Sequence, residues 1–336
     1  MKQEVRKIKE IEKVEKVEKL EKKIFAILGP TATGKTNLAI ELVKKYPFEI
    51  ISVDSAMVYK NMDIGTAKPS HEELKSAPHH LINLCSPDQI YSVADFCRDA
   101  TLKIQEIFSR NHYPLLVGGT MMYFNALKNG LSQLPSRDEN LRQEFLKILN
   151  QEGLPALFNL LKNLDPQAAE RLKPQDTQRI IRALEIFKLS GKSMFDPEQE
   201  LEKSTQKLTY PWCAVGLITQ DLEWQKMNIK NRFLKMLDLG FIQEVKDLKN
   251  QFNLNQDLPS MRSVGYRQVW GYLDQQLTYD QMIERSLIAT AQLAKRQRTW
   301  LRSFDWVELL NPSDLGLLDQ VCSKIDSHLS SPSFEN

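Results

Sequence analysis

The stretch GPTATGKT at residues 29–36 carries residue types that bind phosphate. It matches the pattern G-x-x-x-x-G-K-[ST] and lies between a short apolar run at residues 24–28 and a stretch with helical character at residues 37–45. In such a loop the backbone N–H groups and the positive end of the following helix surround a phosphate. Lys35 adds a positive charge, and the hydroxyl of Thr36 is a ligand of the kind that Mg²⁺ takes. The loop therefore predicts a phosphorylated ligand, with ATP as the first candidate.

Two further polar segments follow apolar runs and are candidates for the same site. Asp54-Ser55 comes after residues 50–53, and Gly118-Gly119-Thr120 comes after residues 115–117. Ligands of open α/β sheets bind beyond the carboxyl ends of the strands, so we expect both segments to lie near the phosphate loop. Asp54 is then a magnesium ligand, a general base, or only the cap of the next helix. The two glycines would let the backbone approach a ligand closely, and Thr120 offers a hydroxyl.

The apolar runs themselves predict the fold. Each is short, and helical stretches separate them, which is typical of buried parallel strands in an α/β protein. We therefore expect a doubly wound parallel sheet of the P-loop NTPase type. The predicted strands are residues 24–28, 50–53, 115–117, 214–218 and 306–310.

The pattern along the chain divides it into a core, an insertion and two ends. We expect a P-loop core at 24–135 plus 208–311 and a mostly helical insertion domain at 136–207, with stops at glycines and prolines. A charged low-complexity extension fills 1–23, and 312–336 is a tail whose tip is expected to be disordered. The stops in the insertion are Gly153, Pro166, Pro174 and Gly191.

Composition narrows the class of protein. The 336 residues are 42% apolar and 26% charged, and no apolar run reaches the length of a membrane span, so we expect no membrane partner. The four cysteines form no CxxC pair, and the N-terminus does not resemble a secretory signal, which favours the cytoplasm. Net charge is only +2, so a nucleic-acid site must come from local clustering. Lys295, Arg298 and Arg302 share one helical face and, with Arg296, form such a cluster.

Five motifs in a fixed order carry a family resemblance. They are GPTATGKT, IISVDSAMVYKNMDIGTAKP at 50–69, LLVGGTMMYFNAL at 115–127, QRIIRALE at 178–185 and RSVGYRQ at 262–268. In this order they are similar to the bacterial tRNA dimethylallyltransferase family, also called tRNA isopentenyltransferases. The resemblance runs from about residue 24 to residue 310.

The resemblance replaces ATP by another phosphorylated ligand. In the family the loop holds the diphosphate of dimethylallyl diphosphate, and the dimethylallyl group moves to N6 of adenosine 37 in tRNAs reading codons that begin with U. Asp54 matches the general base, and Thr120 matches a threonine near the target adenine. Lys35, Arg232 and Mg²⁺ on Thr36 would stabilise the leaving diphosphate.

The resemblance also implies two sets of binding residues and a partner, the anticodon stem-loop of tRNA. We expect the enzyme to work as a monomer, because tRNA must reach the site from outside. Many family members carry glutamine where this chain has Ala56-Met57, which puts a polar contact there in doubt. The diphosphate set is Gly29, Pro30, Thr31, Ala32, Thr33, Gly34, Lys35 and Thr36. The tRNA set is Asp54, Ser55, Ala56, Met57, Thr120, Arg142, Gln178, Arg179, Ile180, Ile181, Arg182, Arg262, Ser263, Val264, Gly265, Tyr266 and Arg267.

Three other functions compete with tRNA prenylation. A small-molecule P-loop kinase would use ATP and take Asp54 as its base, with the arginines of the insertion as a lid. A nucleotide-switched RNA-binding protein is disfavoured, since no guanine-reading NKxD motif is present. A prenyltransferase acting on free adenine nucleotide would need no tRNA contacts. The helical insertion favours tRNA, because it suits a clamp that helps extract a stacked base from the anticodon loop.

Overall fold

The computed structural model describes residues 21–132, 134–196 and 207–331. The chain forms two compact units: unit 1 comprises Met1–Asn125 and Thr209–Asn336, and unit 2 comprises Ala126–Leu208. Most of the predicted N-terminal extension, the tip of the predicted tail and residues 197–206 of the predicted insertion lie outside the described residues.

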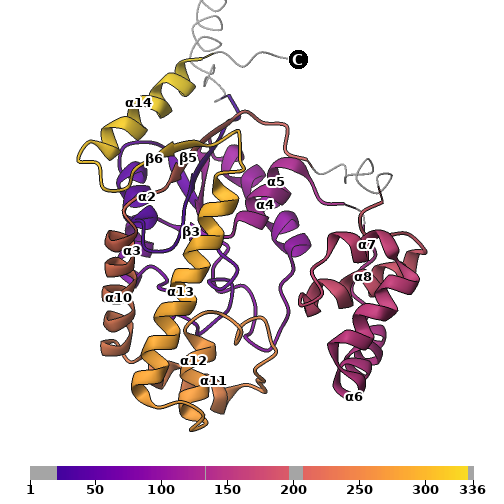
Figure 1. The fold of residues 1–336 in the computed structure, drawn as a ribbon. Coiled ribbons are helices and arrows are strands. Elements are labelled where there is room, and N and C mark those ends of the chain that lie inside the picture. Colours follow the sequence, from indigo (N-terminus) through magenta and orange to yellow (C-terminus); the bar gives the residue numbers. More distant parts are fainter. Residues whose placement is uncertain (1–20, 133, 197–206, 332–336) are drawn as a thin grey trace, which may run out of the picture. The chain divides into compact units, whose positions relative to one another are not determined.

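The described part of unit 1 is built on a parallel sheet of six strands, drawn in Figure 1. The strand order is β3-β2-β4-β1-β5-β6, so β1 lies between two strands that follow it in the chain. The predicted doubly wound, P-loop-like α/β fold is confirmed. Five strands were predicted and the short β3 was not, because two histidines carry no apolar pattern. The strands are β1 (Ile24–Leu28), β2 (Phe48–Val53), β3 (His79–His80), β4 (Tyr113–Gly118), β5 (Trp212–Leu217) and β6 (Glu308–Leu310).

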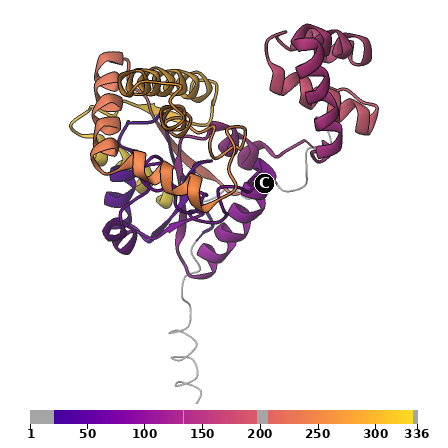
Figure 2. The ribbon, with the colours of Figure 1, turned by 90° about the horizontal axis from the view of Figure 1, so that it is seen from below.

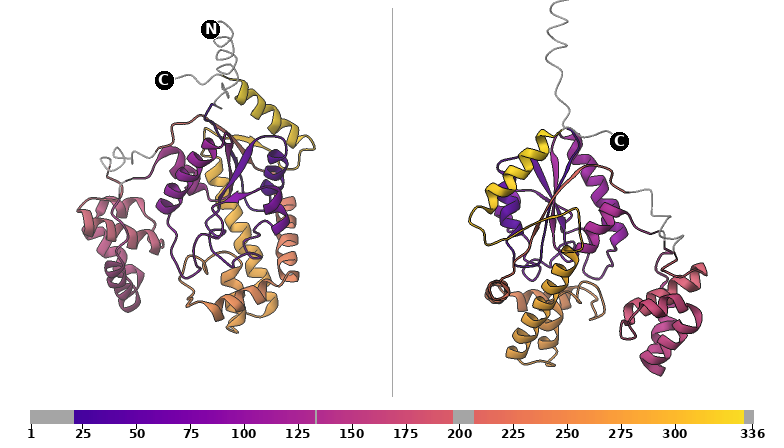
Figure 3. Two further views of the ribbon diagram at one scale, coloured as in Figure 1. Left: turned by 180° about the vertical axis from the view of Figure 1, so that it is seen from behind. Right: turned by 45° about the horizontal axis from the view of Figure 1, so that its top comes forward.

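Helices cover both faces of this sheet. Helices α2 (Lys35–Val43) and α14 (Leu317–Ser330) lie on one face, and α4 (Val93–Ser109) and α5 (Met121–Asn129) on the other, as the right-hand view of Figure 3 shows. Helix α14 differs from the expected tail, because Val321 and Ile325 are buried in the core beside Phe25 of β1. Their spacing of four residues puts them on one face of the helix.

A second group of helices lies beyond the carboxyl ends of the strands (Figures 1 and 2). Its members pack around a separate apolar cluster that includes Phe241, Tyr266 and Met282. This group faces the loops that follow β1, β2 and β4, where the sequence places the candidate site residues. The helices are α10 (Leu222–Asp238), α11 (Phe241–Gln251), α12 (Tyr266–Leu273) and α13 (Tyr279–Leu301), and a short α3 (His71–Ser76) precedes β3.

The described part of unit 2 is helical and has its own core. Helices α6 (Glu139–Leu164), α7 (Pro166–Arg171) and α8 (Thr177–Ser190) bury Phe145, Leu157 and Leu184 among them. The chain breaks at predicted stops: Gly153 kinks α6 with φ of 84°, and Gly191 ends α8 in the left-handed region. Across the described residues, no helix is both long and apolar enough to cross a membrane.

Candidate active site

The phosphate loop is shaped by its own hydrogen bonds. The hydroxyl of Thr33 donates to the carbonyl of Pro30 at 2.9 Å, and the amine of Lys35 donates to the same carbonyl at 2.6 Å. Ala32 and Gly34 have positive φ values of 63° and 82°. Successive N–H groups in such a backbone turn toward a common point, where an anion binds. The loop geometry therefore fits a phosphate at the start of α2.

Lys35 lies in an unusual electrostatic environment. Burial lowers the pKa of Lys35 to about 7, and the positive charge of Arg232 acts in the same direction, whereas Asp54 opposes both. Burial also lowers the pKa of Arg232, again opposed by Asp54. Two cations thus share one site with a single carboxylate close enough to influence both. An anion bound between them would relieve their repulsion.

Asp54 follows β2 and is fixed by its own backbone. Its Oδ1 accepts the N–H of Ala56 at 2.8 Å and that of Met57 at 3.3 Å, which closes a turn at residues 55–58; no helix begins there, so Asp54 caps a turn and not the helix considered from the sequence. The N–H of Ser55 donates to Oγ1 of Thr120 at 3.0 Å, which joins the segments after β2 and β4. Because these bonds orient the carboxyl group, the cap and the predicted base are compatible.

The close approach of the strand ends depends on glycine. A Cβ atom on Gly118 would lie 2.0 Å from the carbonyl oxygen of Val53, and one on Gly29 would lie 2.8 Å from that of Leu217. Such contacts exclude any side chain unless the backbone shifts. The two glycines therefore let the end of β4 approach that of β2 and the end of β1 approach that of β5.

A loop at residues 62–69, within the second motif, forms another wall. Glu244 of α11 accepts the N–H groups of residues 63–65 at 2.9, 2.6 and 3.1 Å, and it also accepts the hydroxyl of Tyr266 at 2.6 Å. Arg232 donates to the carbonyl of Thr66 at 3.3 Å. A Cβ on Gly65 would lie 2.1 Å from the ring of Phe241. Hydrogen bonds therefore connect this wall to α10 and α11 directly, and to α12 through the Glu244 that Tyr266 shares.

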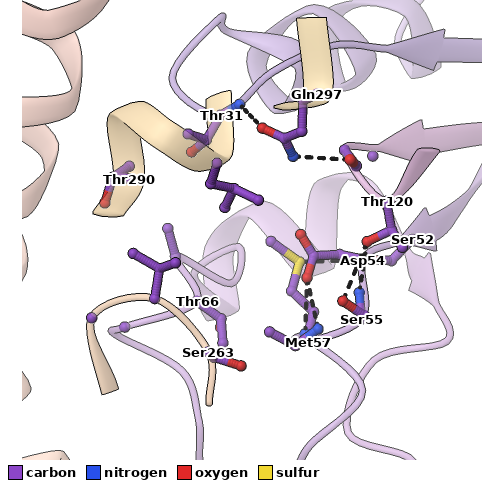
Figure 4. Close-up of a pocket in the computed structure, with 18 of the residues that line it drawn as sticks. Thr31, Ser52, Asp54, Ser55, Met57, Thr66, Thr120, Ser263, Thr290 and Gln297 are labelled. Atoms are coloured by element: carbon purple, nitrogen blue, oxygen red, sulfur yellow. Dashed lines mark hydrogen bonds between the residues drawn. The ribbon is translucent and has the colours of Figure 1, made fainter. Parts of the chain in front are cut away.

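These elements enclose one cavity of about 600 Å³, shown in Figure 4. Gly29, Pro30, Ala32, Thr33 and Gly34 shape the phosphate loop without lining the cavity, and Arg267 is exposed outside it. The cavity brings together most of the residues that the sequence assigned to unit 1. These are Thr31, Lys35, Thr36, Asp54, Ser55, Ala56, Met57, Thr120, Arg232, Arg262, Ser263, Val264, Gly265 and Tyr266.

Part of the cavity wall consists of residues that were not predicted from the sequence. From α10 and α11 it is apolar, and from α13 it is one helical face with spacings of three, four and three residues. The predicted basic face at 295, 298 and 302 does not line the cavity, and Arg298 donates to the buried side chain of Gln225. The spacing of residues 290, 293, 297 and 300 is the sequence signal for the face that does. Of the predicted basic cluster, Arg296 lines the cavity; the residues missed on these three helices are Ile229, Phe233, Met236, Phe241, Thr290, Leu293, Gln297 and Trp300.

The remaining predicted residues belong to unit 2. Arg142 donates to Glu185 at 3.2 Å and to Gln178 at 2.8 Å, and Arg182 donates to Glu185 at 3.5 Å. Glu185 is fully buried, so it organises both guanidinium groups from beneath.

Neighbouring positions on α8 differ in their exposure. Arg179 is exposed and pairs with Asp176. Ile180 and Ile181, included in the expected tRNA set, are wholly buried in the core of unit 2, so their side chains cannot contact a partner.

No metal site is formed by side chains alone within the described ranges: His, Cys, Asp and Glu do not gather there in groups of three or more that could hold an ion. Thr36 lines the cavity beside Lys35. A hydroxyl of this kind, together with phosphate oxygens of a ligand, is the donor set that Mg²⁺ accepts in phosphate loops.

Comparison with known proteins gives consistent matches. A family model described as IPP transferase matches residues 57–304. A tRNA dimethylallyltransferase from Vesicomyosocius okutanii is 47% identical over 88% of this chain and 95% of its own length.

Solved structures give the same picture. A tRNA isopentenylpyrophosphate transferase from Bacillus halodurans is 35% identical, with a TM-score of 0.66 over 91% of this chain and 98% of its own. A eukaryotic dimethylallyltransferase acting on tRNA is 27% identical, with a TM-score of 0.74 over 94% of this chain and 81% of its own.

Proposed function

We propose, from the membership of this chain in the IPP transferase family, that it transfers the dimethylallyl group of dimethylallyl diphosphate to N6 of adenosine 37 in tRNA. The chain belongs to that family: the family model covers residues 57–304, and a curated tRNA dimethylallyltransferase shares 47% of its residues over 88% of the chain. Prenyl transfer to tRNA follows from these relatives. We further propose that the acceptor atom is N6, that the acceptor nucleotide is adenosine 37, and that the residues below have the roles given.

One observation carries it: a single cavity holds a phosphate loop, a carboxylate and an apolar wall. Lys35 and Arg232 supply positive charge, and Ile229, Phe233 and Met236, on the same face of α10 as Arg232, add apolar side chains. A prenyl diphosphate has a matching division between a charged end and a five-carbon apolar end.

Asp54 is the proposed general base. The nitrogen lone pair of N6 attacks C1 of the dimethylallyl group, the bond from C1 to the diphosphate oxygen breaks, and an N6 proton passes to the carboxylate. A positioned base contributes about 10²–10⁴-fold to such a step. Oδ1 of Asp54 is engaged with the N–H groups of Ala56 and Met57, which favours Oδ2 as the proton acceptor.

The leaving diphosphate gains negative charge as the bond breaks. Lys35 and Arg232 flank the cavity, and the phosphate loop supplies N–H donors at the start of α2. Thr36 would hold a magnesium ion that arrives with the diphosphate and adds positive charge to it. Protonation of Lys35 is required for its part, and a bound diphosphate favours that form.

Contacts to tRNA are proposed for both units. In unit 1 they are residues 54–57, Thr120 and residues 262–267, which include the exposed Arg262. In unit 2 we propose Arg142, Gln178, Arg179 and Arg182 as a clamp on the anticodon stem-loop. A monomer in the cytoplasm is the form that we expect to act.

The test uses purified protein, Mg²⁺ and unmodified tRNA whose anticodon loop contains adenosine at positions 36 and 37. Dimethylallyl diphosphate is supplied in one reaction and ATP in another, and digested nucleosides are read by mass spectrometry. We expect a prenyl adduct on adenosine with the first donor only. Asp54→Asn keeps an oxygen for the two capping N–H groups but removes the base, so it should lose most of the activity.

Asp238→Asn, on the exposed last residue of α10, is the matched control and should behave as wild type. Transfer to free adenosine monophosphate at the rate seen with tRNA would favour the nucleotide prenyltransferase. ATP consumption without any prenyl adduct would favour the kinase and contradict the proposal.

A further inference from the structure

We propose that Gln297 is a positioning residue that sets the separation between the phosphate loop and the loop carrying Thr120. Through that second loop it would fix where the leaving group lies relative to Asp54. This rests on the proposed function, because the separation matters for catalysis only if a group leaves a diphosphate near this carboxylate.

The side-chain amide of Gln297 joins the two loops directly. Its Oε1 accepts the N–H of Thr31 at 3.0 Å, and its Nε2 donates to the carbonyl of Gly119 at 2.9 Å. One end of the amide is an acceptor and the other a donor, so a single planar group satisfies both loops at once. Figure 4 shows this bridge beside the cavity.

From Gly119 the connection continues to Asp54. Thr120 is the next residue, and its Oγ1 accepts the N–H of Ser55 at 3.0 Å. Ser55 follows Asp54, whose carboxylate is held by the N–H of Ala56 at 2.8 Å. The path from phosphate loop to carboxylate therefore runs through hydrogen bonds and adjacent peptide groups, with the side chains of Gln297 and Thr120 as its two side-chain links.

The bridge has little freedom at either end. A Cβ on Gly119 would lie 2.5 Å from Nε2 of Gln297, so the amide is packed against the backbone there. At the other end, Thr31 is also held through its carbonyl, which accepts from Nε2 of Gln225 at 3.3 Å. Gln225 is 2% exposed and accepts a hydrogen bond from Arg298. Thr31 is thus anchored on both sides, and Gln297 transmits that position to Gly119.

The hydrogen bonds made within the phosphate loop do not involve Gln297, which contacts the loop only at the N–H of Thr31. Thr33 and Lys35 both donate to Pro30 within the loop. Loss of the bridge should therefore leave diphosphate binding nearly intact while the two loops drift apart. A misplacement of about 1 Å between reacting groups costs on the order of 10²-fold in rate.

The test compares Gln297→Met, which keeps the side-chain length and removes both hydrogen bonds, with Gln292→Met on the same helix. Gln292 is exposed and does not line the cavity. With saturating tRNA and dimethylallyl diphosphate, we expect kcat of Q297M to fall between about 10-fold and 10²-fold. Its melting temperature and its Kd for inorganic diphosphate should stay near the wild-type values, and Q292M should match wild type throughout.

A double-mutant cycle with Thr120→Val separates positioning from general support. If Gln297 acts through the Thr120 loop, the losses caused by Q297M and T120V should be less than additive. Fully additive losses, an unchanged kcat, or a loss seen entirely in diphosphate Kd would each overturn the proposal.

A second variant keeps the test decisive if Q297M does not fold. Gln297→Glu retains an acceptor for the N–H of Thr31 but replaces the donor to Gly119 by an acceptor. A wild-type kcat in Q297E would overturn the proposal, and a reduced kcat with intact diphosphate binding would support it. Failure of the proposed function is separate, since it would show as absence of a prenyl adduct with the wild-type enzyme.

Discussion

Glu244 in unit 1 and Glu185 in unit 2 are both carboxylates that organise predicted site residues, but they hold different kinds of group. Glu244 accepts three backbone N–H groups and one phenol hydroxyl. Glu185 accepts only guanidinium donors, from Arg142 and Arg182. Hydrogen bonds to the backbone fix the path of a loop, whereas hydrogen bonds to long side chains fix the positions of charged groups on helices that are already formed. The first kind therefore shapes the cavity of unit 1, and the second orients the arginines that we propose as a clamp in unit 2.

The largest effect is expected from Glu244→Ala. The N–H groups of residues 63–65 and the hydroxyl of Tyr266 would lose their acceptor. The N–H groups are exposed or half-buried and can turn to water, whereas Tyr266 is buried, and a buried unsatisfied donor costs about 1–3 kcal/mol. Burial raises the pKa of Tyr266 well above its usual value, with Glu244 adding to the shift, so the phenol remains a donor at neutral pH. We expect the free energy of unfolding to fall by about 3 kcal/mol, measured by urea denaturation, with prenyl transfer lost in parallel.

Glu223→Ala is the control for this experiment, because Glu223 is 83% exposed on α10 and pairs only with Lys226 on the surface. Its stability should be close to wild type. Wild-type stability in E244A as well would mean that the packing of Phe241 against Gly65 holds the loop without the carboxylate.

A third carboxylate, Glu49, tests whether a carboxylate that accepts from side chains stabilises the fold less than one that accepts from backbone N–H groups. Burial alone would raise its pKa, but hydrogen bonds from Arg110 and His80, with their charges, outweigh it and lower the pKa of Glu49 to about 2. A carboxyl group with a lowered pKa stabilises the fold above its unfolded pKa of 4.5, and this is lost as pH falls through 2. Because Arg110 is exposed and water screens the pair, we expect a contribution of about 1 kcal/mol at neutral pH.

The pH dependence of Glu49→Gln gives the measurement. Urea denaturation should find the variant less stable than wild type by about 1 kcal/mol at pH 7, with the difference shrinking by about half at pH 3. A difference that does not change with pH would show that the ionised form of Glu49 is not what His80 and Arg110 stabilise.

The sequence predicts the site residues that follow strands, but not the residues whose side chains hydrogen-bond to those loops and position them. Asp54 directly follows an apolar run, Lys35 and Thr120 stand in the segments after two others, and parallel strands bring their carboxyl ends to one edge. Gln297 and Glu244 act across 266 and about 180 residues of chain, through single hydrogen bonds that no local spacing records.

The same limit applies to helices. The face of α13 that lines the cavity is mixed in character, and the predicted basic cluster on this helix stays a prediction, with Arg298 donating to the buried Gln225. Ile180 and Ile181 lie inside one motif with exposed residues, although helical periodicity places them, with Leu184 three and four residues further on, on the buried face of α8.

Glu185→Gln should have a smaller and more selective effect. Without the charge, Arg142 and Arg182 lose the carboxylate that orients them, so the KM for tRNA should rise by about tenfold. The Kd for inorganic diphosphate should not change, because that loop lies in unit 1. Glu152→Gln, at an exposed position of α6, is the control. An equal loss of diphosphate binding would contradict the separate roles given to the two units.

The smallest expected effect is on the pH dependence of diphosphate binding, because the buried amine of Lys35 can lose its proton near neutral pH whereas a guanidinium group does not. Burial lowers the pKa of Lys35 to about 7, Arg232 adds to the decrease and Asp54 opposes it. A bound diphosphate favours the protonated amine, so affinity is full below pH 7 and falls as pH rises above it. Between pH 6.5 and 7.5 the Kd for inorganic diphosphate should rise about threefold from this group alone. Lys35→Arg removes the slope, since arginine stays charged over this range, and leaves only the titration of the ligand itself. Calorimetric titrations of both proteins at the two pH values, subtracted from each other, isolate the lysine. Equal slopes would mean that Lys35 is already protonated throughout, with Asp54 outweighing burial.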